Sequence, residues 1–253
     1  MKKIFIFLDG KTVQADQNVL DSLMPGVMNH QGVFETMLVY KGSIFVLEEH
    51  LSRLKRGLKV YGFKSPYAFK AIKSYLCKMI EKNHLVHGRM RLSIWEEKKK
   101  MHIAIVGQNI SPLSEKDYQQ GFKVILSEER RVRTKFSHIK SLDYKVFRRA
   151  FLAAKECGYD EALLLNNRRE VVEGAITNIF FIQNGVVLTP AVRCGCLNGI
   201  TRNIVLRLAR ADGMSCQMMH GQMEPLLKAE EVFVTNSFLG IMSVTHIGQK
   251  KIG

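Results

Sequence analysis

Lys140 is the first residue whose type and position could carry covalent chemistry. Apolar residues recur at helical spacing from Leu142 to Ala154, and Gly158 follows as a stop. We therefore expect a helix after Lys140, with the lysine at or just outside its N-terminus. There the helix dipole and burial would disfavour the ammonium form and favour an amine that can form a Schiff base. A lysine near a helix start is more often a solvated side chain, so its chemistry depends on its surroundings.

Glu173 is the second such residue, and it lies between two predicted hairpins. Residues 161–166 and 169–174 predict two strands joined by a polar turn, and residues 177–190 predict a hairpin through Asn184-Gly185. A carboxylate among apolar strands is costly unless it has a cationic partner, and a protonated pyridine nitrogen would be such a partner. The alternative is an ordinary carboxylate at the surface end of a strand.

Six separated motifs place these two residues in a known order. They are GVFET at residues 32–36, EEHLSRL at 48–54, KSLDY at 140–144, EGAITNIF at 173–180, NGITR at 198–202 and EVFVTNSFLGIMSV at 231–244. From about residue 32 to residue 244 the chain resembles the class IV (fold type IV) pyridoxal phosphate enzymes. These include branched-chain aminotransferases, D-amino acid aminotransferases and 4-amino-4-deoxychorismate lyases. The resemblance implies two α/β domains with mixed sheets, like D-amino acid aminotransferase, with pyridoxal 5'-phosphate in the cleft between them and a homodimer whose partner contributes to the wall of the site.

The resemblance places three residues around the cofactor ring. Lys140 would hold the cofactor aldehyde and then transfer a proton at the substrate carbon that bore the amine. Glu173 would keep the pyridine nitrogen protonated, so that the ring can accept electrons. Tyr144 matches a tyrosine near the cofactor ring, although a Lys-x-x-x-Tyr spacing is also what helix packing gives.

The cofactor phosphate needs hydrogen-bond donors, and the NGITR motif places backbone N–H groups at the start of a predicted helix. Simple capping by Asn198 or Thr201 is the alternative. By resemblance the phosphate-binding residues are Arg53 of the HLSRL motif, the segment Gly199, Ile200 and Thr201, and Ser237 with its neighbour Asn236.

Thr36 bears on the reaction that follows deprotonation. The lyases resemble this chain in carrying threonine in the GVFET motif, where branched-chain aminotransferases usually carry glycine, and a hydroxyl there could relay a proton during elimination. We therefore expect a 4-amino-4-deoxychorismate lyase that releases pyruvate and 4-aminobenzoate, as in folate biosynthesis, with an aminotransferase of branched-chain or D-amino acids as the alternative. By resemblance, the arginine that binds the substrate carboxylate is Arg91, or Arg89 if the register of the strand differs by two residues. The residues MNHQ before GVFET, and Ser243 in place of a proline, depart from the lyase pattern.

The composition is that of an ordinary soluble protein of 253 residues, 46% hydrophobic and 24% charged. The net charge of +15 invites a nucleic-acid partner, but the lysines are dispersed and no aromatic-basic interleaving is present. We expect no nucleic acid, no membrane and no metal, and an anionic amino compound as substrate. The five cysteines are scattered, and Cys194-Gly195-Cys196 lacks the spacing of a zinc site, so we expect a reducing cytoplasm. A non-catalytic anion-binding or nucleic-acid-binding protein remains a third hypothesis, which predicts a colourless protein.

The pattern of elements predicts mixed α/β structure in two halves. We expect a first domain at residues 1–107, a linker at 108–118 and a second domain at 119–253 that carries the lysine. A helix is expected through residues 47–63, with Gly62 as its stop and an apolar face of Leu51, Leu54, Leu58 and Val60. Further helices are expected from Ser65 as N-cap with Pro66 at N1, and from residue 200. Residues 11–31 have no clean period and stay unassigned.

Overall fold

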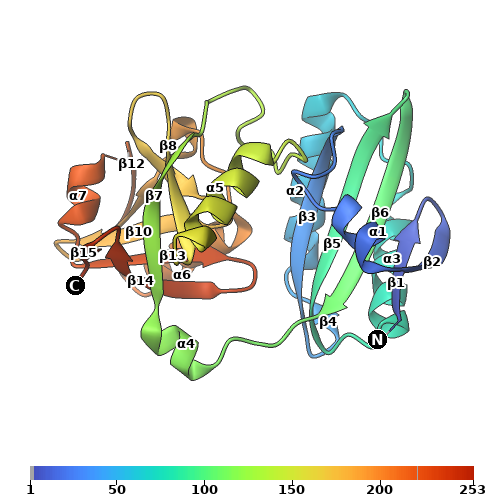
Figure 1. Ribbon diagram of the computed structural model, residues 1–253, viewed down its shortest axis with the longest axis horizontal. Helices are drawn as coiled ribbons and strands as arrows, with labels where there is room; N and C mark the ends of the chain where they lie inside the picture. The colour runs from blue at the N-terminus through green and yellow to red at the C-terminus, as the bar shows by residue number, and fades with distance from the viewer. Residues whose placement is uncertain (1–2, 221) are drawn as a thin grey trace. The chain divides into compact units, whose positions relative to one another are not determined.

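The computed structural model describes residues 3–220 and 222–253, and the chain divides into two compact units (Figure 1). The first unit comprises Met1–Pro112 and Ile139–Lys145, and the second comprises Leu113–His138 and Val146–Gly253. The division after residue 112 lies inside the linker expected at residues 108–118. The segment Ile139–Lys145 differs from the expectation, because it belongs to the first unit although the sequence around it belongs to the second.

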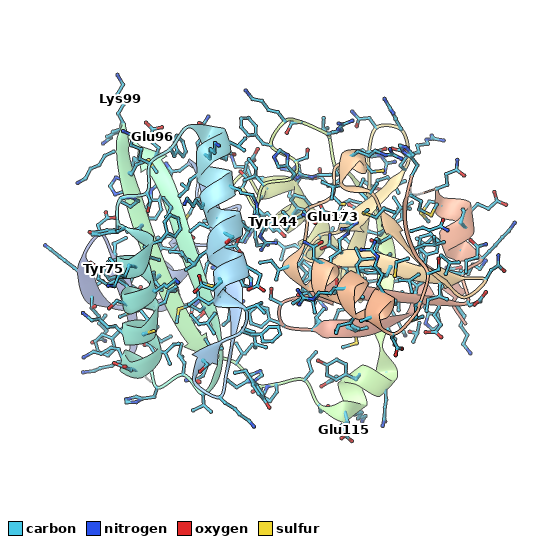
Figure 2. The ribbon with its side chains drawn as sticks, turned by 180° about the vertical axis from the view of Figure 1, so that it is seen from behind. Tyr75, Glu96, Lys99, Glu115, Tyr144 and Glu173 are labelled. Carbon is cyan, nitrogen blue, oxygen red and sulfur yellow. The ribbon has the colours of Figure 1, made fainter. Side chains whose placement is uncertain are left out.

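The first unit contains a six-stranded antiparallel sheet in the order β2-β1-β6-β5-β3-β4. Its strands are β1 (Ile4–Leu8), β2 (Lys11–Ala15), β3 (Gln31–Tyr40), β4 (Ser43–Ile44), β5 (His87–Glu97) and β6 (Lys100–Asn109). The dense lysine run forms the tight turn between β5 and β6, where Lys98 and Lys99 have positive φ angles; Lys99 is labelled in Figure 2. The long β3–β5–β6 ladder gives this unit a rigid platform.

Two helices cover one face of this sheet. Helix α2 (Leu47–Tyr61) contacts β3, and α3 (Phe69–Lys82) contacts β1 and β6 (Figure 2). The prediction of α2 is confirmed, and Leu51, Leu54 and Leu58 are buried. Val60, predicted on the same apolar face, is instead exposed. The predicted start of α3 was wrong: the N-cap is Ala68, because the hydroxyl of Ser65 donates to the carbonyl of Tyr67 in a turn before the helix.

The opposite face of the first unit is covered by segments that the sequence did not resolve. Helix α1 (Gln17–Ser22) is short and begins after Asp16, whose carboxylate accepts from the N–H of Val19. Its Leu20 packs in a core cluster with Trp95 and with Leu142 from the distant segment 139–145. Residues 11–31 lacked a period because a strand, a capped helical turn and a loop share them.

The second unit contains a nine-stranded mixed sheet. Its strands are β7 (Phe122–Arg130), β8 (Glu161–Leu165), β9 (Val171–Gly174), β10 (Asn178–Gln183), β11 (Val186–Pro190), β12 (Cys216–Met219), β13 (Glu231–Asn236), β14 (Gly240–Ile247) and β15 (Lys250–Lys251). The order is β12-β11-β10-β13-β14-β7-β8-β9, with β15 paired to β14. The hairpin predicted through Asn184-Gly185 is present as β10–β11.

The helices of the second unit are α4 (Glu115–Gln120), α5 (Lys145–Glu156), α6 (Ile200–Ala211) and α7 (Met223–Leu227), with a 3-10 turn η1 at Val192–Cys194. Helix α6 covers β10, β11 and β13 through Val205 and Leu206, which pack with Phe180. The described chain contains no helix that is both long and apolar enough to cross a membrane. The mixed sheets and helices agree with the expected α/β class.

Candidate functional site

Lys140 lies in an extended segment of the first unit, and the prediction that a helix begins beside it was wrong. Helix α5 starts five residues later, at Lys145. The carbonyl of Lys140 accepts from the N–H of Phe34 at 2.9 Å, and Ser141 bridges to Val33, so the lysine is aligned against β3. Its amine lies 4.7 Å from the centroid of the Phe34 ring. The position of Lys140 is therefore set by strand pairing and by an aromatic ring.

The sheet face near Lys140 gathers the predicted substrate residues. In the β3–β5 ladder Thr36 pairs with Arg91, and Phe34 pairs with Ser93 two residues away. Because side chains alternate along a strand, Phe34, Thr36 and Arg91 lie on one face of the sheet. Tyr144 packs edge-on against Phe34 with the ring centroids 5.5 Å apart. The structure thus brings Lys140, Thr36, Arg91 and Tyr144 around one phenylalanine.

Arg91 is a buried cation whose electrostatic balance is incomplete. Its side chain is 8% exposed, its Nη1 donates to the sulfur of Met24 at 2.8 Å, and its Nε has no hydrogen-bond partner among the described residues. Burial and the nearby charge of Arg89 lower the pKa of Arg91 to about 10, although Tyr144 opposes this. A thioether is a weak acceptor, so an anion at this position would satisfy the guanidinium far better. The rival Arg89 donates to the amide of Gln108 at 3.1 Å.

Arg53 serves a structural role on the helix-covered side of the sheet. Its Nε and Nη2 donate to the two oxygens of Glu35 at 2.8 and 2.6 Å, and His50 lies 2.7 Å from the same carboxylate. Burial alone would raise the pKa of Glu35, but the charge of Arg53 and the hydrogen bonds from both partners lower it to about 2. The role of Arg53 as a phosphate ligand stays a prediction.

Glu173 lies in β9 of the second unit and is 4% exposed, which excludes the surface alternative. Its Oε2 accepts from the N–H of Leu197 at 2.9 Å and lies 3.5 Å from the amide of Asn178. The Nε of Arg131 stands 3.7 Å from its Oε1. Arg131, which was not predicted from the sequence, is therefore one cationic partner of this carboxylate.

Asn178 connects Glu173 to the start of helix α6. Its amide also donates to the carbonyl of Leu197 at 3.0 Å. Gly199 is the N-cap of α6 and has no side chain that could cap the first turn. A Cβ on Gly199 would collide with the Oδ1 of Asn178 and would lie 3.2 Å from Arg202. The N–H groups of Ile200 and Thr201 in the first helical turn are therefore presented by backbone alone, close to the Glu173 cluster.

The VTNS segment ends β13 in a tight turn. The Oδ1 of Asn236 accepts from the N–H groups of Phe238 and Leu239 at 2.8 and 2.9 Å, and its amide donates to the carbonyl of Ile176. The side chain of Asn236 thus shapes the turn that carries the half-buried Ser237. Both stay predictions as cofactor ligands.

Glu161 is a buried carboxylate that sequence reasoning missed. Its oxygens accept from the N–H groups of Ala162, Ala175 and Ile176 and from the hydroxyl of Thr177, at 2.8 to 3.1 Å. Burial raises the pKa of Glu161 to about 7 although these donors oppose the shift. Its function is to hold the turn that follows Glu173. In the sequence, a glutamate at the first position of an otherwise apolar strand was the signal that could have indicated this buried carboxylate.

The predicted residues thus fall into two groups, one in each unit. Lys140, Tyr144, Thr36, Arg91 and Arg53 belong to the first unit. The second unit carries Glu173, the start of α6 at Gly199, Ile200 and Thr201, and the turn of Asn236 and Ser237.

Comparison with known proteins gives a consistent assignment. Residues 32–247 match the amino-transferase class IV family. The branched-chain-amino-acid aminotransferase of Pseudomonas aeruginosa is 28% identical, and the match covers 98% of this chain and 86% of that protein. The aminodeoxychorismate lyase of Bacillus subtilis is also 28% identical, with coverage of 98% and 88%. The structure of the branched-chain aminotransferase from Thermoproteus uzoniensis with norvaline superposes with a TM-score of 0.88 at 26% identity, covering all of this chain and 90% of that one.

The fold, the motifs and the relatives agree, and they establish the class of cofactor as well. A solved branched-chain amino acid aminotransferase with pyridoxamine 5'-phosphate has the same fold, with a TM-score of 0.89. The order of the motifs along the chain matches the family over residues 32 to 247. This chain belongs to the class IV aminotransferases, a family of enzymes that depend on pyridoxal phosphate.

Proposed function

We propose that this enzyme is a 4-amino-4-deoxychorismate lyase, which eliminates pyruvate from its substrate and leaves 4-aminobenzoate. The observation that carries the proposal is the pairing of Thr36 with the buried Arg91 on the sheet face that holds Lys140. The arginine suits a carboxylate of the substrate, and the hydroxyl is a proton donor and acceptor that a glycine at this position would lack.

The residues of the second unit fit the cofactor. The start of α6 offers backbone N–H groups of the kind that hold a phosphate, and its N-cap Gly199 has no side chain to cap them. The buried Glu173 suits a protonated ring nitrogen of the cofactor. Its carboxylate accepts from the N–H of Leu197, whose carbonyl accepts from the amide of Asn178, just before the start of α6. In this proposal Lys140 binds the aldehyde, Glu173 the ring nitrogen, and Gly199, Ile200, Thr201, Ser237 and Arg53 the phosphate.

The residues of the chain then divide the reaction between them. When bound, pyridoxal phosphate supplies an electron acceptor for the carbon that carries the substrate amine. Arg91 would hold a substrate carboxylate, and the amine of Lys140 would take the proton from that carbon. The C–O bond to the enolpyruvyl group breaks with its electron pair on oxygen, and the hydroxyl of Thr36 can relay the proton held by Lys140 to that oxygen. The six-membered ring of the substrate becomes aromatic, and the atoms of the substrate are divided between 4-aminobenzoate and pyruvate.

Thr36→Val tests the proposal. The purified holoenzyme is incubated with 4-amino-4-deoxychorismate and no oxo acid, and pyruvate and 4-aminobenzoate are followed together. We expect equal release of both by the parent enzyme, and a loss of about 100-fold in kcat for Thr36→Val, since a positioned proton donor contributes roughly 100-fold to 10,000-fold. Thr36→Ser keeps the hydroxyl and is expected to retain most of the rate. Equal rates for the valine and serine variants would remove Thr36 from the mechanism.

An aminotransferase is the second candidate, and the branched-chain aminotransferases among the relatives favour it. An α-amino acid carries one carboxylate, which Arg91 could hold equally well. Formation of glutamate from 2-oxoglutarate and a branched-chain or D-amino acid, without any release of pyruvate from 4-amino-4-deoxychorismate, would make this the function. Thr36→Val would then leave the rate of transamination nearly unchanged.

We also propose that the enzyme works as a homodimer in the cytoplasm. The family resemblance supports the dimer. The five cysteines, all free of disulfides, support a reducing compartment. Sedimentation equilibrium of the holoenzyme tests the dimer, and a mass of 28.9 kDa in solution would contradict it.

A further inference from the structure

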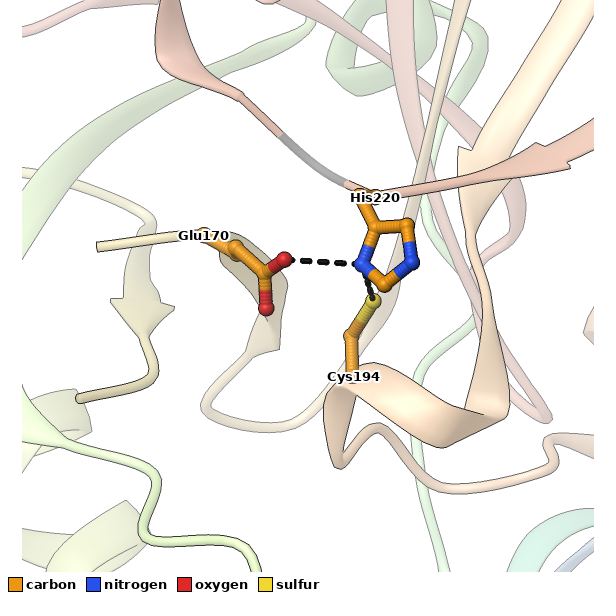
Figure 3. A group of neighbouring side chains, drawn as sticks. All are labelled: Glu170, Cys194 and His220. Atoms are coloured by element: carbon orange, nitrogen blue, oxygen red, sulfur yellow. Dashed lines mark hydrogen bonds and ion pairs between the residues drawn. The ribbon is translucent and has the colours of Figure 1, made fainter. Parts of the chain in front are cut away.

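Three side chains that can bind a metal converge at one edge of the second unit (Figure 3). The Sγ of Cys194 lies 3.7 Å from the Nδ1 of His220, and that nitrogen lies 2.8 Å from the Oε1 of Glu170. All three donor atoms lie within 4.8 Å of one another. The thiol is buried, whereas 49% of the histidine side chain is exposed, so the group is open to solvent on one side.

The sheet topology explains why residues far apart in sequence meet there. Strands β11 and β12 are parallel, and Pro190 pairs with Met219 at their ends. Parallel strands end at the same edge of a sheet, so Cys194 after β11 and His220 after β12 emerge together. The turn between β8 and β9 brings Glu170 to the same edge, where the carbonyl of Glu170 accepts from the N–H of Asn166.

The geometry fits a metal better than a catalytic relay. A nucleophile–histidine–carboxylate relay uses one ring nitrogen for the nucleophile and the other for the carboxylate. Here the thiol and the carboxylate both face the Nδ1 of His220, and the thiol also lies 3.7 Å from the carbonyl oxygen of Met219. Zinc bonds of about 2.0 to 2.3 Å in a tetrahedron place ligand atoms roughly 3.3 to 3.7 Å apart. The sulfur–nitrogen distance meets this value, and the nitrogen–oxygen distance needs to open by about half an ångström.

The surroundings orient two of the ligands. The amide of Asn166 donates to the Oε2 of Glu170 at 2.6 Å and to the carbonyl of Cys194 at 3.1 Å. This leaves the Oε1 of Glu170 turned towards His220. Outer partners of this kind fix ligand orientation in metal sites.

The neighbouring charges select the type of metal. A cavity of about 190 Å³ beside the group is lined by Glu170 and His220 together with Arg133, Arg168 and Arg193. Three arginines and a single carboxylate disfavour calcium and magnesium, which need several oxygen ligands. A thiolate with an imidazole favours zinc. Cys196 is not a ligand here, since its Sγ faces the carbonyls of Pro190 and Ala191 instead.

We propose that Glu170, Cys194 and His220 form a zinc site with one open coordination position. The site lies apart from the residues assigned to the cofactor, and it does not depend on which reaction the enzyme catalyses. Zinc here would tie the ends of β11 and β12 to the β8–β9 turn, and would hold the loop that leads from Cys194 to the N–H of Leu197 beside Glu173.

Cobalt titration of the purified holoenzyme tests the site. Tetrahedral cobalt with a thiolate ligand gives ligand-field bands at wavelengths longer than the cofactor absorbs, and competition with zinc then gives the zinc affinity. We expect one cobalt per chain and bands that zinc abolishes. His220→Ala and Cys194→Ser should each weaken zinc binding by more than about 100-fold, and Asn166→Ala by roughly 10-fold to 100-fold.

Two variants serve as controls for the cobalt titration. Cys216→Ser removes a cysteine at the start of β12 whose thiol donates to the carbonyl of Met214, and should leave the bands unchanged. His220→Ala alters a half-exposed side chain, so it reports on the site even if Cys194→Ser does not fold. The absence of cobalt bands in the parent enzyme, or bands that persist in His220→Ala, would overturn the proposal.

Discussion

At the scale of single residues, the turn that follows Glu173 in the second unit depends on the absence of a side chain at Gly174. A Cβ on Gly174 would collide with the hydroxyl of Thr177 and would lie 2.8 Å from the Oε2 of Glu161. That carboxylate anchors the N–H groups of Ala175 and Ile176. The small residue after Glu173 is therefore a packing requirement of the turn that Glu161 holds together.

Gly174→Ala should consequently displace both the turn and the preceding glutamate. We expect the free energy of unfolding to fall by about 1–3 kcal/mol, the usual cost of overpacking, and pyridoxal phosphate to dissociate more readily. Urea unfolding and the fall in cofactor absorbance on dilution measure the two effects. Gly158→Ala is the control, because that glycine has a φ of 77° and no atom within 4 Å of the added Cβ. It should lose about 1 kcal/mol through its backbone conformation alone and keep its cofactor. Equal cofactor loss in both variants would show that the Gly174 effect is not local.

At the scale of elements, helix α2 is fixed to β3 by a buried ion pair as well as by leucines. Glu35 is fully buried between the strand and the helix, where His50 and Arg53 meet it one helical turn apart. Apolar burial supplies affinity between helix and sheet, whereas this network specifies one register, because sliding the helix by a turn would leave charges unpaired. The GVFET and HLSRL motifs are thus two halves of one contact.

Glu35→Gln should destabilise the first unit strongly. It leaves the guanidinium of Arg53 buried without its anion, for which we expect a loss of about 3–5 kcal/mol in the free energy of unfolding at neutral pH. Glu48→Gln is the matched control, because the ion pair of Glu48 with Lys73 is exposed and should contribute less than about 1 kcal/mol. A loss below about 1 kcal/mol for both variants would contradict a stabilising role for the buried pair.

The same carboxylate predicts how stability depends on acid. Its pKa is about 2 in the folded enzyme and near 4.5 when unfolded, so the unfolded chain binds the proton first as the pH falls. The contribution is therefore complete above about pH 4.5 and is lost between about pH 4.5 and 2, and it amounts to something on the order of 3 kcal/mol. Urea unfolding from pH 6 to pH 3 should show a steeper decline for the parent enzyme than for Glu35→Gln. Parallel curves would contradict this assignment.

Elements with a strong period were predictable, and those set by distant partners were not. Helices α2 and α6 and the β10–β11 hairpin follow from apolar spacing and turn residues that act locally. The extended conformation around Lys140 follows from pairing with β3, more than a hundred residues earlier, so local sequence suggested a helix instead. The residues proposed to hold the cofactor were predicted from motifs, and their roles stay predictions. Arg131, Asn178 and Glu161 were missed because their roles arise only when separated strands pair.

At the scale of the whole molecule, the first unit is discontinuous in sequence. The chain passes between the units after residues 112, 138 and 145. The segment 139–145 is held in the first unit by the fully buried Leu142, and by backbone hydrogen bonds from Phe34 to Lys140 and from Leu142 to Gly32. Burial of the leucine contributes about 1.5–3 kcal/mol, and each hydrogen bond adds roughly 1 kcal/mol.

Separate expression of residues 1–112 and 113–253 should therefore give an incomplete first unit. We expect fragment 1–112 to be less stable than the first unit of the intact chain, and a mixture of the two fragments to recover cofactor binding. Covalent retention of the cofactor after borohydride reduction measures recovery, and it should disappear when the second fragment carries Lys140→Ala. A mixture with Leu142→Ala in the second fragment should recover less. Full stability of fragment 1–112 alone would contradict the role of the segment.

The pairing of residues 139–145 with β3 also fixes an order of events during synthesis. A ribosome releases the chain from its N-terminus, so the sheet of the first unit can form while one of its faces still waits for a segment that has not been made. Phe34 lacks the side chains of Leu142 and Tyr144, which pack with it, until translation has passed residue 145 by the length of the exit tunnel. The nascent enzyme thus exposes an apolar surface for an interval that ends when its own lysine arrives, and that interval is when a chaperone would have most to bind.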